Sequence, residues 1–278
     1  MPRLIHRTAR IILKVVPFLR KWDRLVGGLR GRFEPHEEEI EVKLGRDHRM
    51  ILNLADYVCF QIYMRGFYEA EVVRHLRSYL RPGMTFFDVG AHFGQYTLVA
   101  AGLVGGSGAV HAFEPGPQQH EYLKRNVRLN GLGQVCANFV ALGESIGTVG
   151  FVVAPLRNLG GSHVAPADGG TLEVPMITLD MYCHDSGVAA VHAMKIDVEG
   201  AELQVLRGAS ETLARRPPSV IFYECIDRLC RRFGYRAVAT HELLLSHGYR
   251  IHTVRGWKLE PVDALGSEDI TDFVALHP

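Results

Sequence analysis

The stretch TFFDVGAHFGQYTLVAAGLV, residues 85–104, constrains the fold most, because it joins a buried strand to a helix through a turn containing Gly90 and Gly94. Glycine lets the backbone of such a turn approach a ligand closely. The N–H groups at the start of the following helix point toward the same place. This layout is typical of a site for a nucleotide-like cofactor.

Strands and helices alternate along the rest of the chain. Strands are predicted at residues 85–90, 109–115, 135–143, 193–200, 219–225, 249–254 and 272–278, and helices at 94–104, 118–131, 201–216 and 241–248. A two-stranded hairpin at 40–54 and a helix at 68–83 come before them, while glycine pairs at 160–161 and 169–170 indicate a less regular stretch. Such alternation predicts an α/β fold of the Rossmann-like, three-layer type, with a mostly parallel sheet and an antiparallel edge strand.

The charge is balanced over the whole chain but not at its start. The formal net charge is +1, which gives no general reason to expect nucleic acid as a partner. Residues 1–33, however, hold nine Lys or Arg and one acid, Asp23. A basic amphipathic helix there could lie on an anionic membrane surface, or it could pack on the protein with its basic face in solvent. We expect residues 1–35 to form a helical extension and residues 36–278 to form one domain, divided into 36–83 and 84–278.

The five cysteines have unrelated spacings and include no C-x-x-C pair, so the sequence predicts neither a disulfide framework nor a zinc site. A reducing compartment fits this composition, and we expect a cytoplasmic protein, with peripheral contact at the inner face of the membrane as a second possibility. No stretch has the roughly 20 apolar residues needed to span a bilayer.

Two acids bear on the choice of cofactor. The dinucleotide fingerprint G-x-G-x-x-G lacks its middle glycine here, and Asp88 would repel a pyrophosphate but suit the ammonium group of a methionine tail. Glu114, at the end of the next strand, can accept two hydrogen bonds from ribose hydroxyls and serves either cofactor. The pattern favours S-adenosylmethionine over NAD.

The second informative stretch is MKIDVEGAE, where Asp197 and Glu199 emerge near the end of a strand. Methyl transfer to a hydroxyl needs an oxygen, methyl and sulfur held in line, and a base nearby. Candidate bases are Asp197, Glu199, His163 and Glu224. Asp197 and Glu224 could alternatively share a divalent cation, although no metal-ligand motif indicates one.

Four stretches together, FFDVGAHFGQYT, AFEPGPQQHEYLKRNVRLNGL, VALGES and MKIDVEGAELQVLRG, resemble the FkbM family of class I S-adenosylmethionine-dependent methyltransferases. The resemblance covers roughly residues 68–278 and implies a seven-stranded sheet with an antiparallel edge strand. It implies O-methylation of a hydroxyl on a sugar of a glycolipid or oligosaccharide, or on a polyketide-like natural product.

The resemblance also assigns roles to individual residues. It places Asp88, Gly90 and Gly94 at the methionine part of the cofactor, Glu114 at the ribose, Glu144 near adenine and Asp197 at the reacting end. His92 and Tyr96, in the same stretch, are further expected cofactor contacts. His92 stands where the family often has asparagine. Asn158, Ser162 and His163 lie in a candidate substrate loop, with Glu199 as a further substrate contact and Asp197, Glu224 and His163 as catalytic candidates.

Two other functions stay open at this point. An NAD-dependent oxidoreductase is opposed by the missing glycine, by Asp88 and by the lack of a Tyr-x-x-x-Lys pair. A cofactor-binding module without turnover, held at a membrane by its basic start, is opposed by the presence of every expected site residue.

Overall fold

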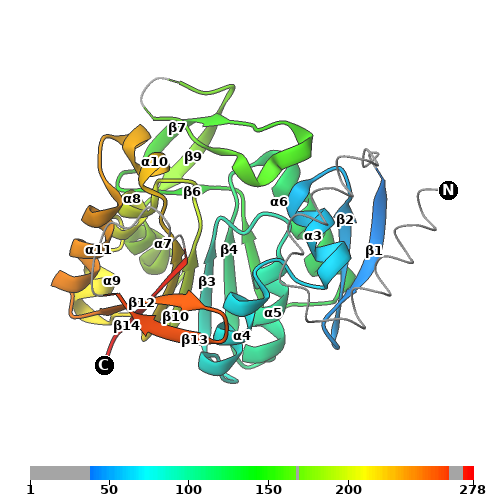
Figure 1. The fold of residues 1–278 in the computed structure, drawn as a ribbon, viewed down its shortest axis with the longest axis horizontal. Coiled ribbons are helices and arrows are strands. Elements are labelled where there is room, and N and C mark those ends of the chain that lie inside the picture. Colours follow the sequence, from blue (N-terminus) through cyan, green and yellow to red (C-terminus); the bar gives the residue numbers. More distant parts are fainter. Residues whose placement is uncertain (1–37, 167–168, 263–271) are drawn as a thin grey trace.

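A computed structural model of the chain describes residues 38–166, 169–262 and 272–278 (Figure 1). The basic extension predicted for residues 1–35, with its proposed membrane contact, therefore lies outside the described residues. Within the described ranges, no helix has both the length and the apolar character needed to cross a membrane.

The centre of the fold is an eight-stranded sheet in the order β13-β12-β14-β11-β10-β3-β4-β5. Its strands are β3 (Thr85–Val89), β4 (Ala109–Phe113), β5 (Val135–Asn138), β10 (Ala193–Ile196), β11 (Val220–Glu224), β12 (Arg250–Arg255), β13 (Lys258–Pro261) and β14 (Asp272–Leu276). The five strands from β5 to β11 run parallel, β14 runs antiparallel between β11 and β12, and β13 is an antiparallel edge strand. The predicted α/β class with an antiparallel edge is confirmed, and β13 makes the sheet one strand wider than expected.

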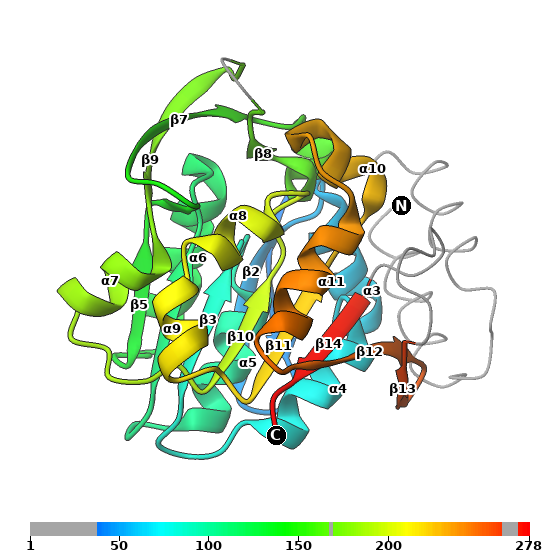
Figure 2. The same cartoon turned by 90° about the vertical axis from the view of Figure 1, so that its left-hand side faces the viewer.

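Helices cover both faces of this sheet (Figure 2). The α5 helix (Gln95–Val104) and α4 (Ala70–Tyr79) pack on one face, and α7 (Leu179–Asp185), α8 (Glu202–Arg207), α9 (Ser210–Arg215) and α11 (Ala237–Ser246) pack on the other. Adjacent residues of β3 serve different cores: Phe86 faces the first layer and Phe87 the second. A strand buried on both faces is continuously apolar, which is why the sequence pattern of β3 predicted its position well.

The N-terminal part of the described chain consists of a hairpin and two helices. The hairpin strands β1 (Glu39–Leu44) and β2 (His48–Asn53) pair antiparallel as predicted, and α4 confirms the predicted helix. The α3 helix (Tyr57–Arg65) was not predicted, because its almost continuous apolar sequence shows no clear stripe. Residues of the hairpin, α3 and α4 share one apolar core with β3 and α5. This part is therefore built into the main body.

A second, four-stranded sheet lies beside the first and rises above it in Figure 2. It comprises β6 (Ala141–Leu142), β7 (Gly147–Val152), β8 (His163–Val164) and β9 (Leu172–Ile177), with the η1 3-10 helix (Leu156–Gly161) between β7 and β8. The single strand predicted at 135–143 is wrong, since β5 and β6 belong to different sheets. The stretch predicted to be irregular pairs closely instead: a Cβ on Gly150 would lie 1.8 Å from the carbonyl oxygen of Gly169.

The continuous helix predicted at 201–216 is also wrong, because α8 and α9 are separate. The break falls at Gly208, where an added Cβ would lie 2.0 Å from the carbonyl oxygen of Gly143. A further short helix, α10 (Asp227–Cys230), and the η2 3-10 helix (Arg231–Phe233) follow β11 and were not predicted. The α10 helix lies at the same end of the molecule as the small sheet (Figure 2).

Candidate active site

A cavity of about 340 Å³ lies at the carboxyl ends of β3, β4, β10 and β11. This is the end of a parallel sheet at which α/β proteins bind ligands. The α3 helix and the η1 loop close the cavity from the side of the hairpin and the small sheet, through Tyr57, Val58, Ile62, Asn158 and Leu159. Its size is within the range of small-molecule sites.

The glycine turn between β3 and α5 forms one wall of the cavity. Gly90 has φ +81°, and the N–H groups of Gly90 and Ala91 both donate to the carbonyl of Phe113 at the end of β4. A Cβ on Gly90 would lie 1.8 Å from the carbonyl oxygen of Asp197. Glycine is therefore required where the ends of β3 and β10 meet, because any side chain would collide with the Asp197 carbonyl.

Glu114 occupies the next wall and is held rigidly. Its two carboxylate oxygens accept hydrogen bonds of 2.7 Å from the backbone N–H groups of His92 and Gly116. Burial raises the pKa of Glu114 to about 7, and those two N–H donors act in the opposite direction. A carboxylate fixed in this way keeps lone pairs directed at the cavity, and vicinal hydroxyls could donate to them.

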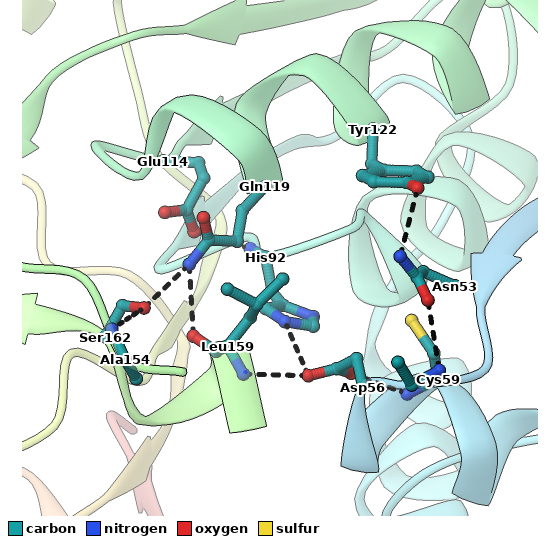
Figure 3. A network of polar contacts seen from close by, with 11 residues as sticks. Asn53, Asp56, Cys59, His92, Glu114, Gln119, Tyr122, Ala154, Leu159 and Ser162 are labelled. Atoms are coloured by element: carbon teal, nitrogen blue, oxygen red, sulfur yellow. Dashed lines mark hydrogen bonds and ion pairs between the residues drawn. The ribbon is translucent and has the colours of Figure 1, made fainter. Parts of the chain in front are cut away.

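A polar network ties the loops around the cavity together (Figure 3). Asp56 caps α3 by accepting from Cys59 N–H and also accepts from Leu159 N–H in η1, at 2.9 Å in each case. Gln119 of α6 (Pro117–Leu129) donates to the Leu159 carbonyl and to Ser162 Oγ, both at 3.0 Å. The candidate substrate loop is thus attached to both α3 and α6 by buried hydrogen bonds.

His92 lies between this network and the glycine turn. Its ring stacks on Phe93, with the centroids 4.5 Å apart, and its Nε2 is 3.9 Å from Asp56 Oδ2. Burial lowers the pKa of His92, so the imidazole is neutral at physiological pH. His92 has φ +52°, which is uncommon for a residue other than glycine and marks a backbone conformation imposed by the site.

The carboxyl ends of β10 and β11 bring three carboxylates together. Oxygen atoms of Asp197, Glu199 and Glu224 lie within 4.8 Å of one another. Burial raises the pKa of Glu199 to about 7, and burial followed by the charge of Asp197 raises the pKa of Glu224 strongly. A carboxyl group with a pKa near neutrality is suited to accept and return a proton at physiological pH, whereas the strongly raised pKa of Glu224 favours its protonated form.

Lys195 supplies the positive charge at this end of the cavity. Its Nζ lies 2.7 Å from Asp197 Oδ2 and 4.7 Å from the centroid of the Tyr96 ring. Burial lowers the pKa of Lys195, but the charge of Asp197 and Glu69 raises it more, so the ammonium remains protonated. The Tyr96 hydroxyl in turn donates to Glu69 Oε2 at 2.7 Å.

Most of the predicted site residues line this one cavity. They are Gly90, His92, Tyr96, Glu114, Asn158, Ser162, His163, Asp197, Glu199 and Glu224.

Asp88 lies beneath the cavity, 1% exposed, where its carboxylate accepts a 2.5 Å hydrogen bond from Thr97 Oγ1. Gly94 is outside the lining and packs against Leu123, and Glu144 is exposed and paired with Arg207 at 3.2 Å. Three predicted cofactor contacts are therefore absent from the cavity wall.

Several lining residues were not predicted. The most important are Glu69, Tyr68, Lys195, Gln119 and Arg228. Lys195 alternates with Asp197 in β10, so the period of the strand could have indicated that both side chains face the same way. Glu69 precedes a helix and resembles an ordinary acid at a helix start, so no local signal distinguishes it.

Comparison with known proteins points to one chemistry. Residues 88–251, more than half of the chain, match the family model described as the methyltransferase FkbM domain. The chain is 30% identical to 31-O-demethyl-FK506 methyltransferase FkbM of Streptomyces tacrolimicus, over 63% of this chain and 81% of that protein. It is 28% identical to the hexuronic acid methyltransferase AglP of Haloferax volcanii, over 54% of this chain and 59% of that protein, so it spans less than two thirds of this second relative.

Solved structures with a similar chain course include two methyltransferases. Methyltransferase FkbM from Methylobacillus flagellatus superposes with a TM-score of 0.46 at 15% identity, covering 78% of this chain and 52% of that chain. The O-methyltransferase from Bacillus cereus, solved in complex with SAH, superposes with a TM-score of 0.44 at 12% identity, covering 74% of this chain and 76% of that chain.

Proposed function

The chain belongs to the FkbM methyltransferase family, and we propose that it transfers the methyl group of S-adenosylmethionine to a hydroxyl of a small-molecule acceptor. The observation that supports this most is the joining of the glycine turn, Glu114 and the three carboxylates of β10 and β11 in a single cavity. The acceptor hydroxyl is on a sugar of a glycolipid or oligosaccharide, or on a polyketide-like ring. Of the two relatives, one is named for 31-O-demethyl-FK506 and the other for hexuronic acid.

The cavity walls fit the proposed cofactor. Gly90 lets the ends of β3 and β10 meet beneath the cavity, where a Cβ would collide with the Asp197 carbonyl, and the fixed carboxylate of Glu114 would accept hydrogen bonds from both ribose hydroxyls. The apolar residues Val140, Ala141 and Leu142, which follow β5, provide a wall for the adenine ring. The cofactor supplies an electrophilic methyl group on a sulfonium, so the enzyme mainly has to hold the acceptor in line with it.

The acceptor hydroxyl loses its proton to a carboxylate of the chain in this proposal. The bound cofactor would supply the methyl group, and Asp197, or Glu224 when its carboxyl group is ionised, would take the proton from the acceptor hydroxyl. Their side chains lie within 4.8 Å of each other. His163, whose Nδ1 lies 2.9 Å from the carbonyl oxygen of Gly161, lines the cavity on the acceptor side. Asn158, Ser162 and Glu199 are proposed to contact the acceptor.

Calorimetric titration with S-adenosylmethionine, S-adenosylhomocysteine and NAD tests the cofactor. We expect binding of the first two and no binding of NAD. Transfer of a radiolabelled methyl group to a panel of uronic acids, glycolipids and macrolides then tests the acceptor, with base-stable labelling of a hydroxyl as the expected product. Binding of NAD alone, or label recovered only on nitrogen or carboxyl groups, would refute the proposal.

A further inference from the structure

The carboxylate expected to bind the amino group of the cofactor does not face the cavity. Asp88 is 1% exposed and is bonded to Thr97, beneath the glycine turn. Glu69 lines the cavity instead. It accepts a hydrogen bond from Tyr96, so it lies beside the first turn of α5, the helix that follows the glycine turn. The end of the cavity next to the methionine part of the cofactor is therefore served by a carboxylate from another part of the chain.

We propose that Glu69 and Lys195 recognise the amino-acid end of the cofactor: Glu69 accepts hydrogen bonds from its α-ammonium group, and Lys195 donates to its α-carboxylate. This inference rests on the proposed function. Both side chains line the cavity, and the same aromatic ring links them, since Tyr96 donates to Glu69 at 2.7 Å and its ring centroid lies 4.7 Å from Lys195 Nζ. An α-amino acid presents one cation and one anion a few ångströms apart, and Glu69 and Lys195, which both contact Tyr96, offer the opposite charges.

The backbone around Glu69 is held in an unfavourable conformation. Glu69 has φ +46° and ψ +52°, in the left-handed region, at the residue before α4. The neighbouring Tyr68 exchanges two hydrogen bonds with the side chain of Gln95, at 2.7 and 2.9 Å. Strain of this kind persists only where surrounding contacts impose it, and it concentrates at ligand sites. Here it directs the Glu69 side chain toward α5 and the cavity.

The charges near Lys195 favour a cationic ligand. Lys195 interacts electrostatically with Asp197, Glu69 and Glu224, so this end of the cavity holds more acidic groups than ammonium groups, even with Glu224 in the neutral form that its raised pKa favours. Asp272, at the start of β14, also acts on Glu69. An α-ammonium beside Glu69 would reduce this excess, and Lys195 retains N–H donors beyond the one given to Asp197. The site thus suits a zwitterion better than a neutral group.

The test compares two ligands that differ only at the amino-acid end. S-adenosylhomocysteine carries this end, and 5′-methylthioadenosine keeps the adenosine and sulfur but lacks it. For Glu69→Gln we expect S-adenosylhomocysteine to bind roughly 10- to 100-fold more weakly and methylthioadenosine to bind within about twofold of wild type. Glu71→Gln, an exposed acid in the first turn of the same helix, is the matched control and should change neither.

Lys195→Met is tested with a third ligand, decarboxylated S-adenosylmethionine, whose binding should not depend on Lys195. Because this substitution leaves Asp197 without its ion-pair partner, thermal unfolding is measured in parallel, and Glu69→Gln remains decisive if the lysine variant does not fold.

Equal weakening of S-adenosylhomocysteine and methylthioadenosine in Glu69→Gln would overturn the inference. So would a selective loss of S-adenosylhomocysteine in Asp88→Asn. Failure of wild type to bind any of these ligands would instead refute the proposed function and this inference with it.

Discussion

The two ends of the cavity are built differently. At the β3–β4 end, Glu114 and the glycine turn are fixed by hydrogen bonds to backbone groups close in sequence, within about 30 residues of one another. At the β10–β11 end, Asp197, Glu199 and Glu224 gather beside one another, with raised pKa values for the last two. The first end is fixed by backbone hydrogen bonds, whereas the second gathers carboxyl groups whose raised pKa values favour proton exchange over permanent charge. We therefore propose that the first end holds the ribose and that the group that takes the acceptor proton lies at the second.

The largest effect is expected at the point where the two ends touch. Gly90→Ala places a Cβ 1.8 Å from the Asp197 carbonyl oxygen, at a residue with φ +81°. We expect a loss of about 3–5 kcal/mol in the free energy of unfolding, from overpacking and the left-handed backbone together. Urea denaturation measures it.

Gly133→Ala is the matched control for this substitution. No atom lies within 4 Å of its added Cβ, and Gly133 is exposed, so the free energy of unfolding should change by no more than about 0.5 kcal/mol. Similar losses in both variants would mean that the contact between the ends of β3 and β10 is not tight in solution.

The next effect isolates the binding end. Glu114→Gln removes the charge that two ribose hydroxyls are proposed to meet, and each such hydrogen bond contributes about 1.5–3 kcal/mol. The affinity for S-adenosylhomocysteine should fall on the order of 10²- to 10⁴-fold by calorimetry. The affinity for methylthioadenosine should fall equally, because both ligands carry the ribose. Glu121→Gln, an exposed acid on α6, should leave both affinities unchanged. If Glu114→Gln weakened only one ligand, its place at the ribose would be wrong.

The reacting end should show the opposite behaviour. For Asp197→Asn and Glu224→Gln we expect a kcat lower by about 10²- to 10⁴-fold for whichever residue takes the acceptor proton. Cofactor affinity should change by less than about tenfold. Methyl transfer under saturating cofactor, with the acceptor found by screening, measures the rate. Full activity in both variants would remove Asp197 and Glu224 from the catalytic step and leave Glu199 and His163 as the candidate bases.

The same contrast explains how much the sequence could predict. The β3 turn and Glu114 lie within one strand–helix–strand unit, so local glycine spacing and strand ends predicted that they would lie close together at the cavity. A side chain at a strand end can face either the cavity or the layer beneath, and the hydrogen bond to Thr97 holds Asp88 in that layer, which the sequence pattern could not predict. Glu69 reaches the site through the packing of α4 on α5, and Glu144 leaves it by pairing with Arg207 across a different loop. Such long-range contacts leave no periodic signal.

The smallest effect, and the one that tests both ends together, is the pH dependence of cofactor binding. Burial raises the pKa of both Glu114 and Glu69 to about 7. The backbone N–H groups beside Glu114 and the Lys195 ammonium beside Glu69 act in the opposite direction and lower these pKa values. Asp88 and Asp197 face Glu114, and Asp272, Asp197 and Tyr96 face Glu69. Both acids are therefore largely protonated at pH 6, and only the ionised forms are full acceptors for ribose hydroxyls and an ammonium.

Binding of S-adenosylhomocysteine should accordingly tighten as the pH rises from 6 to 8, because the ligand favours the deprotonated carboxylates and releases protons on binding. A single carboxyl with a pKa near 7 is about one-tenth ionised at pH 6, so each group contributes at most about tenfold. Methylthioadenosine meets only Glu114 and should show about half the logarithmic change. Calorimetry in buffers of different ionisation enthalpy counts the protons. If the affinities of the two ligands changed equally with pH, Glu69 would not titrate on binding of the amino-acid end. In Glu114→Gln, methylthioadenosine should lose its pH dependence while S-adenosylhomocysteine keeps part of it. That result would assign the remaining proton to Glu69.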